Sequence, residues 1–390
     1  MQAPMQSWDD QRIKRERLAL LQATMRQRNV GALYLEDSMF KRYVLNTKVP
    51  GSAVFVPVEG EALAIVRRRD IGYVGAQHPN VRLPFESRGG AHSESGDANE
   101  SGDGAAIGDG VADLMREYGL EGEQVAVDLL GPVAYFGLTR AEIALVDAAP
   151  IFEKTWSVKT DDELEIYRAI GHQYEHAMTA FRDALRPGIT ENQLAAVITS
   201  AWYEADGEDI AQLNVCVAEN MNPWKRWPTQ RAANDGDFAG VDLHGRGFNG
   251  LRGDASRTFF VGEHPTAAHR DLYRRAYDYL RSSIAVWRAG RTIEDAMRDV
   301  PRVPPSIQPQ LFNYNYAHGV GLGSSDYPHV NPMRPAIDDV LKVNQVLAIE
   351  CYFAEENHPL CVKLEEQIIV RDGEPELLGP AMPFDERLIR

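Results

Sequence analysis

The chain has 390 residues, 44% of them hydrophobic and 25% charged, which is typical of a globular protein of about two domains. Its net charge of -16 argues against nucleic-acid partners and against a basic membrane-binding face, and its longest apolar runs, such as 346–349, are far too short to span a membrane. The N-terminus lacks a signal-peptide pattern and the three cysteines are sparse, so we expect a cytoplasmic protein.

The first part of the chain alternates helical and strand patterns. Apolar residues at helical spacing predict a helix over 10–29. Short apolar runs predict strands at 32–35, 52–57, 62–66 and 124–129, and a helix is expected at 111–118. The Gly-, Ser- and Asp-rich stretch 87–110 is expected to be a long surface loop. Together these patterns predict a small α/β domain over residues 1–152.

A second domain, of the α+β class, is expected over residues 153–390. Thr160 followed by three acidic residues is a strong helix start, and the helix should run to 185. Another helix should follow over 190–205, and a third over 268–288. Strand-like segments are expected at 211–218, 238–243, 256–261, 346–353 and 363–370.

Five residues of this second domain form a candidate metal-ligand set: Asp242, Asp254, His318, Glu350 and Glu365. Four lie in or beside the predicted strands, so their side chains could converge on one point. Four carboxylates and one imidazole make an oxygen-rich set that suits two divalent ions sharing bridging carboxylates. Taken singly, such an acid is more often a solvated or ion-paired surface residue, and such a histidine is more often structural; the joint pattern favours the metal site.

The order and contexts of these residues resemble the creatinase/aminopeptidase ("pita-bread") family, which includes methionine aminopeptidases, Xaa-Pro peptidases and creatinase. The motifs are Asp254-Ala255-Ser256-Arg257-Thr258-Phe259, His318-Gly319-Val320-Gly321 and Lys363-Leu364-Glu365-Glu366. The resemblance implies a pita-bread fold for the second domain and a creatinase-type fold for the first. It also implies a two-metal site on the five residues and, because the creatinase-type domain commonly supports dimers, a homodimer.

The surroundings of the five residues depart from the peptidase pattern. A histidine is expected upstream of Asp242, but residues 220–228 contain none and carry Trp224 and Trp227 instead. His329 follows His318 by 11 residues, near the place of an expected His-Glu pair, but the next residue is a valine. Asp254 follows Asp242 by 12 residues, one more than is usual in the peptidases.

These departures resemble the iron-dependent dimethylsulfoniopropionate lyases of the same fold. The shared features are Asn222-Pro223-Trp224, the 12-residue Asp spacing, an acid-aromatic-Pro element after His318, and Val362-Lys363-Leu364-Glu365-Glu366-Gln367. The acid-aromatic-Pro element comes one residue late here. In those lyases a second Asp follows the first by two residues, and here that position is His244. His244 could replace it as a metal ligand, act as an acid or base, or point away from the site.

The lyase resemblance implies cleavage of a C–S bond in a small zwitterionic metabolite. A base, for which Asp242 and His244 are the candidates, removes the proton α to the substrate carboxylate, while metal ions stabilise the developing charge. A sulfonium group suits aromatic faces. The expected substrate-binding residues are Trp224, Trp227, Tyr316, Tyr327 and His329, although each aromatic residue could equally be core packing. Two divalent ions are expected, iron by resemblance, with Mn, Co or Zn also compatible with the ligands.

Two other functions remain open. In a hydrolase, such as an Xaa-Pro peptidase or another enzyme acting on C–N bonds, a metal-bound hydroxide would attack the substrate and Glu350 would relay the proton. A third possibility is a binding module that has lost its metals. The presence of all five ligand types argues against that last function.

Overall fold

The computed structural model describes residues 7–49, 53–85, 104–224, 227–303, 316–323, 326–331, 339–354 and 360–390. The chain divides into two compact units, Asp9–Trp156 and Ser157–Arg390, and the described residues Ser7 and Trp8 group with the second. The boundary expected at residue 152 falls inside helix α6 (Ala149–Trp156). The whole of α6 belongs to the first unit because Phe152 and Trp156 both pack against Phe40 of that unit.

The first unit is a six-stranded mixed sheet with helices, ordered β4-β3-β2-β1-β5-β6. Its strands are β1 (Val30–Leu35), β2 (Ala53–Pro57), β3 (Leu63–Ile65), β4 (Val81–Arg82), β5 (Gln124–Val127) and β6 (Leu145–Asp147). Its other helices are α1 (Asp10–Gln27), α2 (Ser38–Leu45), α3 (Ile71–Gly75), α4 (Gly104–Glu117) and α5 (Pro132–Arg140). The predicted helix over 10–29 and the four predicted strands are confirmed, whereas α2, α3, α5 and α6 were not foreseen.

Helix α4 corrects the loop expected over 87–110. It begins at Gly104, while residues 87–103 lie outside the described part of the chain. Gly104 and Gly108 of α4 face Gly137 of α5 so closely that a Cβ atom at any of the three would clash with the other helix. These glycines therefore serve close helix packing, in a segment whose composition had suggested a loop.

The second unit contains two sheets flanked by helices. Its strands are β7 (Asp209–Val217), β8 (Phe238–Arg246), β9 (Ala255–Phe260), β10 (Ala317–Gly319), β11 (Asp326–Val330), β12 (Val346–Ala354), β13 (Cys361–Ile369) and β14 (Glu376–Leu378). Its helices are α7 (Asp161–Ala184), α8 (Glu191–Glu204), α9 (Ala267–Ile284), α10 (Ile293–Asp299) and α11 (Glu386–Ile389). The expected α7, α8, α9 and the five expected strands are confirmed. The Thr160 and Thr190 side chains cap α7 and α8 through capping boxes with Glu163 and Gln193.

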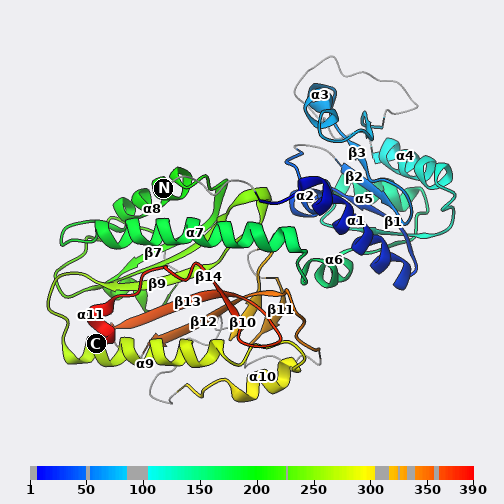
Figure 1. The fold of residues 1–390 in the computed structure, drawn as a ribbon. Coiled ribbons are helices and arrows are strands. Elements are labelled where there is room, and N and C mark those ends of the chain that lie inside the picture. The colour runs from blue at the N-terminus through cyan, green and yellow to red at the C-terminus, as the bar shows by residue number, and fades with distance from the viewer. Residues whose placement is uncertain are drawn as a thin grey trace. The chain divides into compact units, whose positions relative to one another are not determined.

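One sheet has the order β7-β8-β9 and the other β11-β10-β12-β13-β14 (Figure 1). Side chains link them where β9 meets β13: the Thr258 hydroxyl donates to the Lys363 carbonyl oxygen at 2.9 Å, and the Arg257 guanidinium donates to that of Glu365 at 2.7 Å. Helix α9 packs against β12 and β13. This junction brings together strands that carry the predicted ligands. Every helix in the described residues is too short or too polar to cross a bilayer.

Candidate metal centre

Strands β8 and β9 pair as an antiparallel hairpin that carries two of the predicted ligands. Asp242 lies opposite Ser256 on β9 and opposite Asn214 on β7. The same register, which also pairs Leu243 with Ala255, places His244 opposite Asp254. Since alternate residues of a strand point to the same face, Asp242 and His244 project together, towards the side that Asp254 also faces.

The other three predicted ligands come from the larger sheet. Glu350 on β12 is directly paired with Glu365 on β13, so both side chains lie on one face. His318 on β10 pairs with Ala348, two residues before Glu350, and therefore shares that face. Nδ1 of His318 donates to the carbonyl oxygen of Gly319 at 3.0 Å, which leaves Nε2 pointing at the carboxylates.

The fold brings all five residues together in a buried cluster. Nε2 of His318 lies 3.6 Å from Asp254 Oδ2, 3.5 Å from Glu365 Oε1 and 4.0 Å from Glu350 Oε1. Ser256 connects the two sheets, because its hydroxyl lies 2.9 Å from both Asp242 Oδ1 and Glu365 Oε2. No side chain of the five is more than 11% exposed.

A ring of polar groups holds some of the carboxylate oxygens. The Lys363 ammonium is ion-paired with Glu350 and lies 3.1 Å from Glu365 Oε2. Asn214 and Trp224 donate to Asp242 Oδ2 at 3.3 and 3.4 Å. These contacts fix the carboxylates in orientation, the role that outer groups have around metal ligands.

Other atoms of the cluster make no hydrogen bond with the described residues. They are both oxygens of Asp254, Oε1 of Glu365 and both ring nitrogens of His244, all of them buried. A buried polar atom without a partner is costly, and here several such atoms lie close enough to share one ion. Asp242, His244 and Asp254 form one group of suitable geometry, and Asp254, His318 and Glu365 form another. The cluster therefore fits divalent metal ions, with Asp254 common to both groups.

The crowding of acids shifts the pKa values of the cluster. Burial, together with the charge of Glu365, raises the pKa of Asp254 to about 7. Burial opposes the ionisation of His318, but the carboxylates of Glu365 and Asp254 still raise its pKa to about 9. Burial would also raise the pKa of Glu365, yet Lys363 and His318 hold it at about 2. The metal-free site therefore favours added positive charge, which protons or metal ions can supply.

A pH dependence of stability follows for the metal-free protein. Asp254 and His318 bind a proton more tightly in the folded chain than in the unfolded chain, so the stability this provides is lost as the pH rises towards about 7 and about 9, respectively. We expect the melting temperature of metal-free protein to fall between pH 6.5 and 9. Saturation with a divalent ion should remove most of this fall, because the ion replaces the protons. Calorimetry at both pH values tests it, and a metal-free protein that melts at the same temperature throughout would contradict it.

The expected substrate-binding residues differ in their contacts with the cluster and in their burial. Trp224 lies against Asp242, and its ring packs on Gly240, where a Cβ atom would be 2.7 Å from Cζ3 of the indole. His329 pairs with His318 across β10 and β11 and so shares its face. The Tyr327 hydroxyl donates to Asp339 Oδ2 at 2.6 Å. Tyr316 is half-buried against the core, and Trp227 is 73% exposed.

Four residues around the cluster were not foreseen: Lys363, Ser256, Asn214 and Tyr352. The hydroxyl of Tyr352 accepts from the backbone nitrogen of Trp224 at 3.2 Å and so ties the Trp224 segment to β12. Strand alternation could have identified Lys363, Ser256 and Tyr352, because each lies two residues from a predicted ligand on the same strand or at its edge. Asn214 depends on the register between β7 and β8, which the sequence does not specify.

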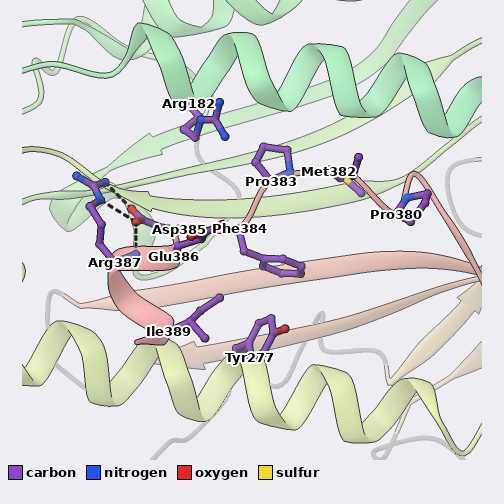
Figure 2. Close-up of a pocket in the computed structure, with 11 residues that line it drawn as sticks. Arg182, Tyr277, Pro380, Met382, Pro383, Phe384, Asp385, Glu386, Arg387 and Ile389 are labelled. Carbon is purple, nitrogen blue, oxygen red and sulfur yellow. Dashed lines mark hydrogen bonds and ion pairs between the residues drawn. The ribbon is translucent and has the colours of Figure 1, made fainter.

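A separate pocket of about 660 Å³ lies between α7, α9 and the C-terminal segment (Figure 2). Figure 2 shows Phe384 and Tyr277 facing this space, and the pair formed by Arg387 and Asp385 at its edge. Phe384 also packs on the buried Arg257 guanidinium at 4.1 Å. None of the five predicted ligands lines the pocket, so we do not connect it with the metal centre.

Known proteins share both the sequence pattern and the fold. The model of metallopeptidase family M24 matches residues 165–372, more than half of the chain. The dimethylsulfoniopropionate lyase DddP of Roseobacter denitrificans is 25% identical over 286 residues, a match that spans 71% of this chain but only 63% of that relative. The DddP protein of Roseovarius nubinhibens is 25% identical over 98% of this chain and 88% of its own length.

Among solved structures, an Xaa-Pro dipeptidase from Bacillus anthracis superposes with a TM-score of 0.79 at 18% identity, covering 95% of this chain and 99% of that chain. This similarity extends over both units and establishes the expected architecture, a pita-bread fold preceded by a smaller domain. The clusters of carboxylates and histidines that could bind metal lie within the matched residues. The chain therefore belongs to metallopeptidase family M24, the creatinase/aminopeptidase family, with DddP-type lyases among its relatives.

Proposed function

We propose that this protein is a metal-dependent lyase that cleaves the C–S bond of a small zwitterionic metabolite, as in the conversion of dimethylsulfoniopropionate to acrylate and dimethyl sulfide. The ligands would be Asp242, Asp254, His318, Glu350 and Glu365, and the buried oxygens of Asp254 and Glu365 that make no hydrogen bond with the described residues support two divalent ions. Iron is proposed from the resemblance, while Mn, Co or Zn would also suit these donors. The ions, when bound, would stabilise negative charge that develops on the substrate carboxylate.

The observation that carries the proposal is the position of Trp224. In the peptidase pattern a histidine is expected in this region, whereas here an indole lies against Asp242 and packs on β8. A sulfonium group carries a fixed positive charge and cannot donate a hydrogen bond, so an aromatic face beside a carboxylate suits it. The proposed substrate-binding residues are therefore Trp224 first, followed by His329, Tyr327, Tyr316 and Trp227.

The proposed reaction is an elimination. A base removes the proton α to the carboxylate, the C–H electron pair forms the new double bond, and dimethyl sulfide leaves with the electrons of the C–S bond. Asp242, His244 and Glu350 are the proposed groups for proton transfer, because all three lie in the cluster and are buried or nearly so. Lys363 and Ser256 would hold the neighbouring carboxylates in position.

Replacing Trp224 tests the role of the indole. We expect Trp224→Leu to raise the KM for dimethylsulfoniopropionate about tenfold, since a desolvated cation–π contact contributes about 1–2 kcal/mol. Trp224→Phe, which keeps an aromatic face, should recover most of that loss. Tyr203→Leu removes an exposed aromatic residue of α8 and serves as the control. If Trp224→Leu leaves KM unchanged, the indole does not bind the cation.

The direct test of the function is headspace detection of dimethyl sulfide after dimethylsulfoniopropionate is added to the metal-loaded protein. Release that depends on metal supports the lyase. The second candidate is an Xaa-Pro peptidase or another C–N hydrolase, favoured by the similarity of the whole chain to the Xaa-Pro dipeptidase fold. Release of proline from an Xaa-Pro dipeptide, without dimethyl sulfide, would overturn the lyase in its favour.

We propose a cytoplasmic homodimer that acts on a small molecule. Sedimentation velocity of the purified protein tests the dimer, and a single monomeric species at micromolar concentration would contradict it.

A further inference from the structure

The hairpin of β8 and β9 places an additional nitrogen donor inside the cluster. His244 lies two residues after Asp242 on the same face and opposite Asp254 in the register of the hairpin. Its side chain is 12% exposed, so it lies almost wholly within the protein. The position of His244 therefore follows from the pairing of the strands that carry both aspartates.

The atoms of His244 lie at the distances of a shared coordination site. Its Nδ1 is 2.9 Å from Asp254 Oδ2, and its Nε2 is 3.5 Å from Asp242 Oδ1. Despite these short distances, neither ring nitrogen forms a hydrogen bond with good geometry to a described residue, and neither oxygen of Asp254 does. Metal-ligating atoms around a common ion are expected to lie close together, to be buried, and to point at the ion and not at one another.

We propose that His244 is a metal donor and that it sets the metal preference of the centre. Asp242, His244 and Asp254 would hold one ion, and Asp254, His318 and Glu365 the other. Each position then has one imidazole and two carboxylates, with further ligation available from Glu350. Imidazole favours Fe(II), Co, Ni and Zn, whereas positions with oxygen donors alone favour Mn and Mg. The inference rests on the proposed two-metal site and adds which ions that site selects.

The proposed role of His244 as a metal donor excludes its role as the base. A ring nitrogen bound to an ion cannot accept the substrate proton, so proton transfer would pass to a carboxylate, either Asp242 or Glu350.

Metal competition tests the proposal without relying on activity. The intact protein is stripped of metal and dialysed against equal concentrations of Co²⁺ and Mn²⁺, and bound metal is measured by mass spectrometry. The wild-type chain should bind two ions per chain with a preference for Co²⁺. His244→Ala should lower the affinity for one of the two ions at least about tenfold. That is the smallest loss of affinity typical when a group that only supports a metal ligand is removed. His244→Asp should keep two ions and shift the Co²⁺ to Mn²⁺ ratio about tenfold towards Mn²⁺.

His264→Ala, at an exposed position after β9, is the matched control and should behave as wild type. Circular dichroism checks folding, and His244→Asp decides the matter if His244→Ala does not fold. Two ions with unchanged affinities and an unchanged Co²⁺ to Mn²⁺ ratio in the His244 variants would overturn the inference but leave the proposed function standing. A wild-type chain that binds neither ion would overturn the metal-dependent function itself, and the inference with it.

Discussion

Asp254→Asn is expected to abolish both metal binding and activity. Among the described residues, Asp254 belongs to both groups of possible ligands, so its loss affects both ions. We expect activity to fall by at least about 100-fold, since even groups that only support metal ligands contribute 10–100-fold. Metal content by mass spectrometry and turnover of the active substrate measure the two effects.

The same substitution should not destabilise the metal-free protein. The Asp254 carboxylate is 1% exposed, and burial and the charge of Glu365 outweigh the attraction of His244 and raise its pKa to about 7, so an isosteric amide removes a charge that is unfavourable without metal. The melting temperature of metal-free Asp254→Asn should therefore equal or exceed that of metal-free wild type. Asp271→Asn, on the exposed side of α9, is the control for a change of charge alone. Full activity in Asp254→Asn would refute the assignment of the site.

Lys363→Met is expected to have the largest effect on stability. Its ammonium is buried and ion-paired with Glu350 and Glu365, and removal of one partner from a buried ion pair costs about 3–5 kcal/mol. Without the lysine, two neighbouring carboxylates lose their compensating charge. A divalent ion can supply that charge, so added metal should raise the melting temperature of Lys363→Met more than that of wild type.

A matched control lies on the opposite face of the same strands. Arg257 is fully buried, and its guanidinium lies 2.7 Å from Glu366 Oε1. Arg257 directly follows Ser256 and Glu366 directly follows Glu365, so this pair points to the other face of the strands. Arg257→Met should be destabilised by a similar amount, about 3–5 kcal/mol, but gain no more from metal than wild type does. Denaturant unfolding with and without Co²⁺ compares the three proteins. If Co²⁺ raises the free energy of unfolding of Lys363→Met and Arg257→Met by equal amounts, Lys363 is not part of the metal centre.

Local sequence signals predicted much of the fold. The Thr160 and Thr190 caps marked the starts of α7 and α8 because capping depends on neighbours in sequence. The short helices α2, α3, α5 and α6 were missed because their apolar residues span too few turns to show a helical period. The start of α4 was missed because Gly104 and Gly108, which allow two helices to touch, give its first turns the composition of a loop.

The site was predictable where it depends on strand alternation and not where it depends on tertiary contact. Order and context singled out the five proposed ligands, and alternation alone could have added Lys363. The bond from Trp224 to Asp242 and the bridge that Ser256 makes between Asp242 and Glu365 depend on how separate segments meet, and no local pattern encodes them. The same holds for His244, whose face was predictable but whose distance from Asp254 was not.

The measurement that tests the central claim most directly is a crystal structure of the Co²⁺-loaded protein, with anomalous diffraction recorded at the cobalt edge. We predict two anomalous peaks, one between Asp242, His244 and Asp254 and one between Asp254, His318 and Glu365. No peak within the cluster at saturating Co²⁺ would contradict the metal centre and the chemistry proposed for it.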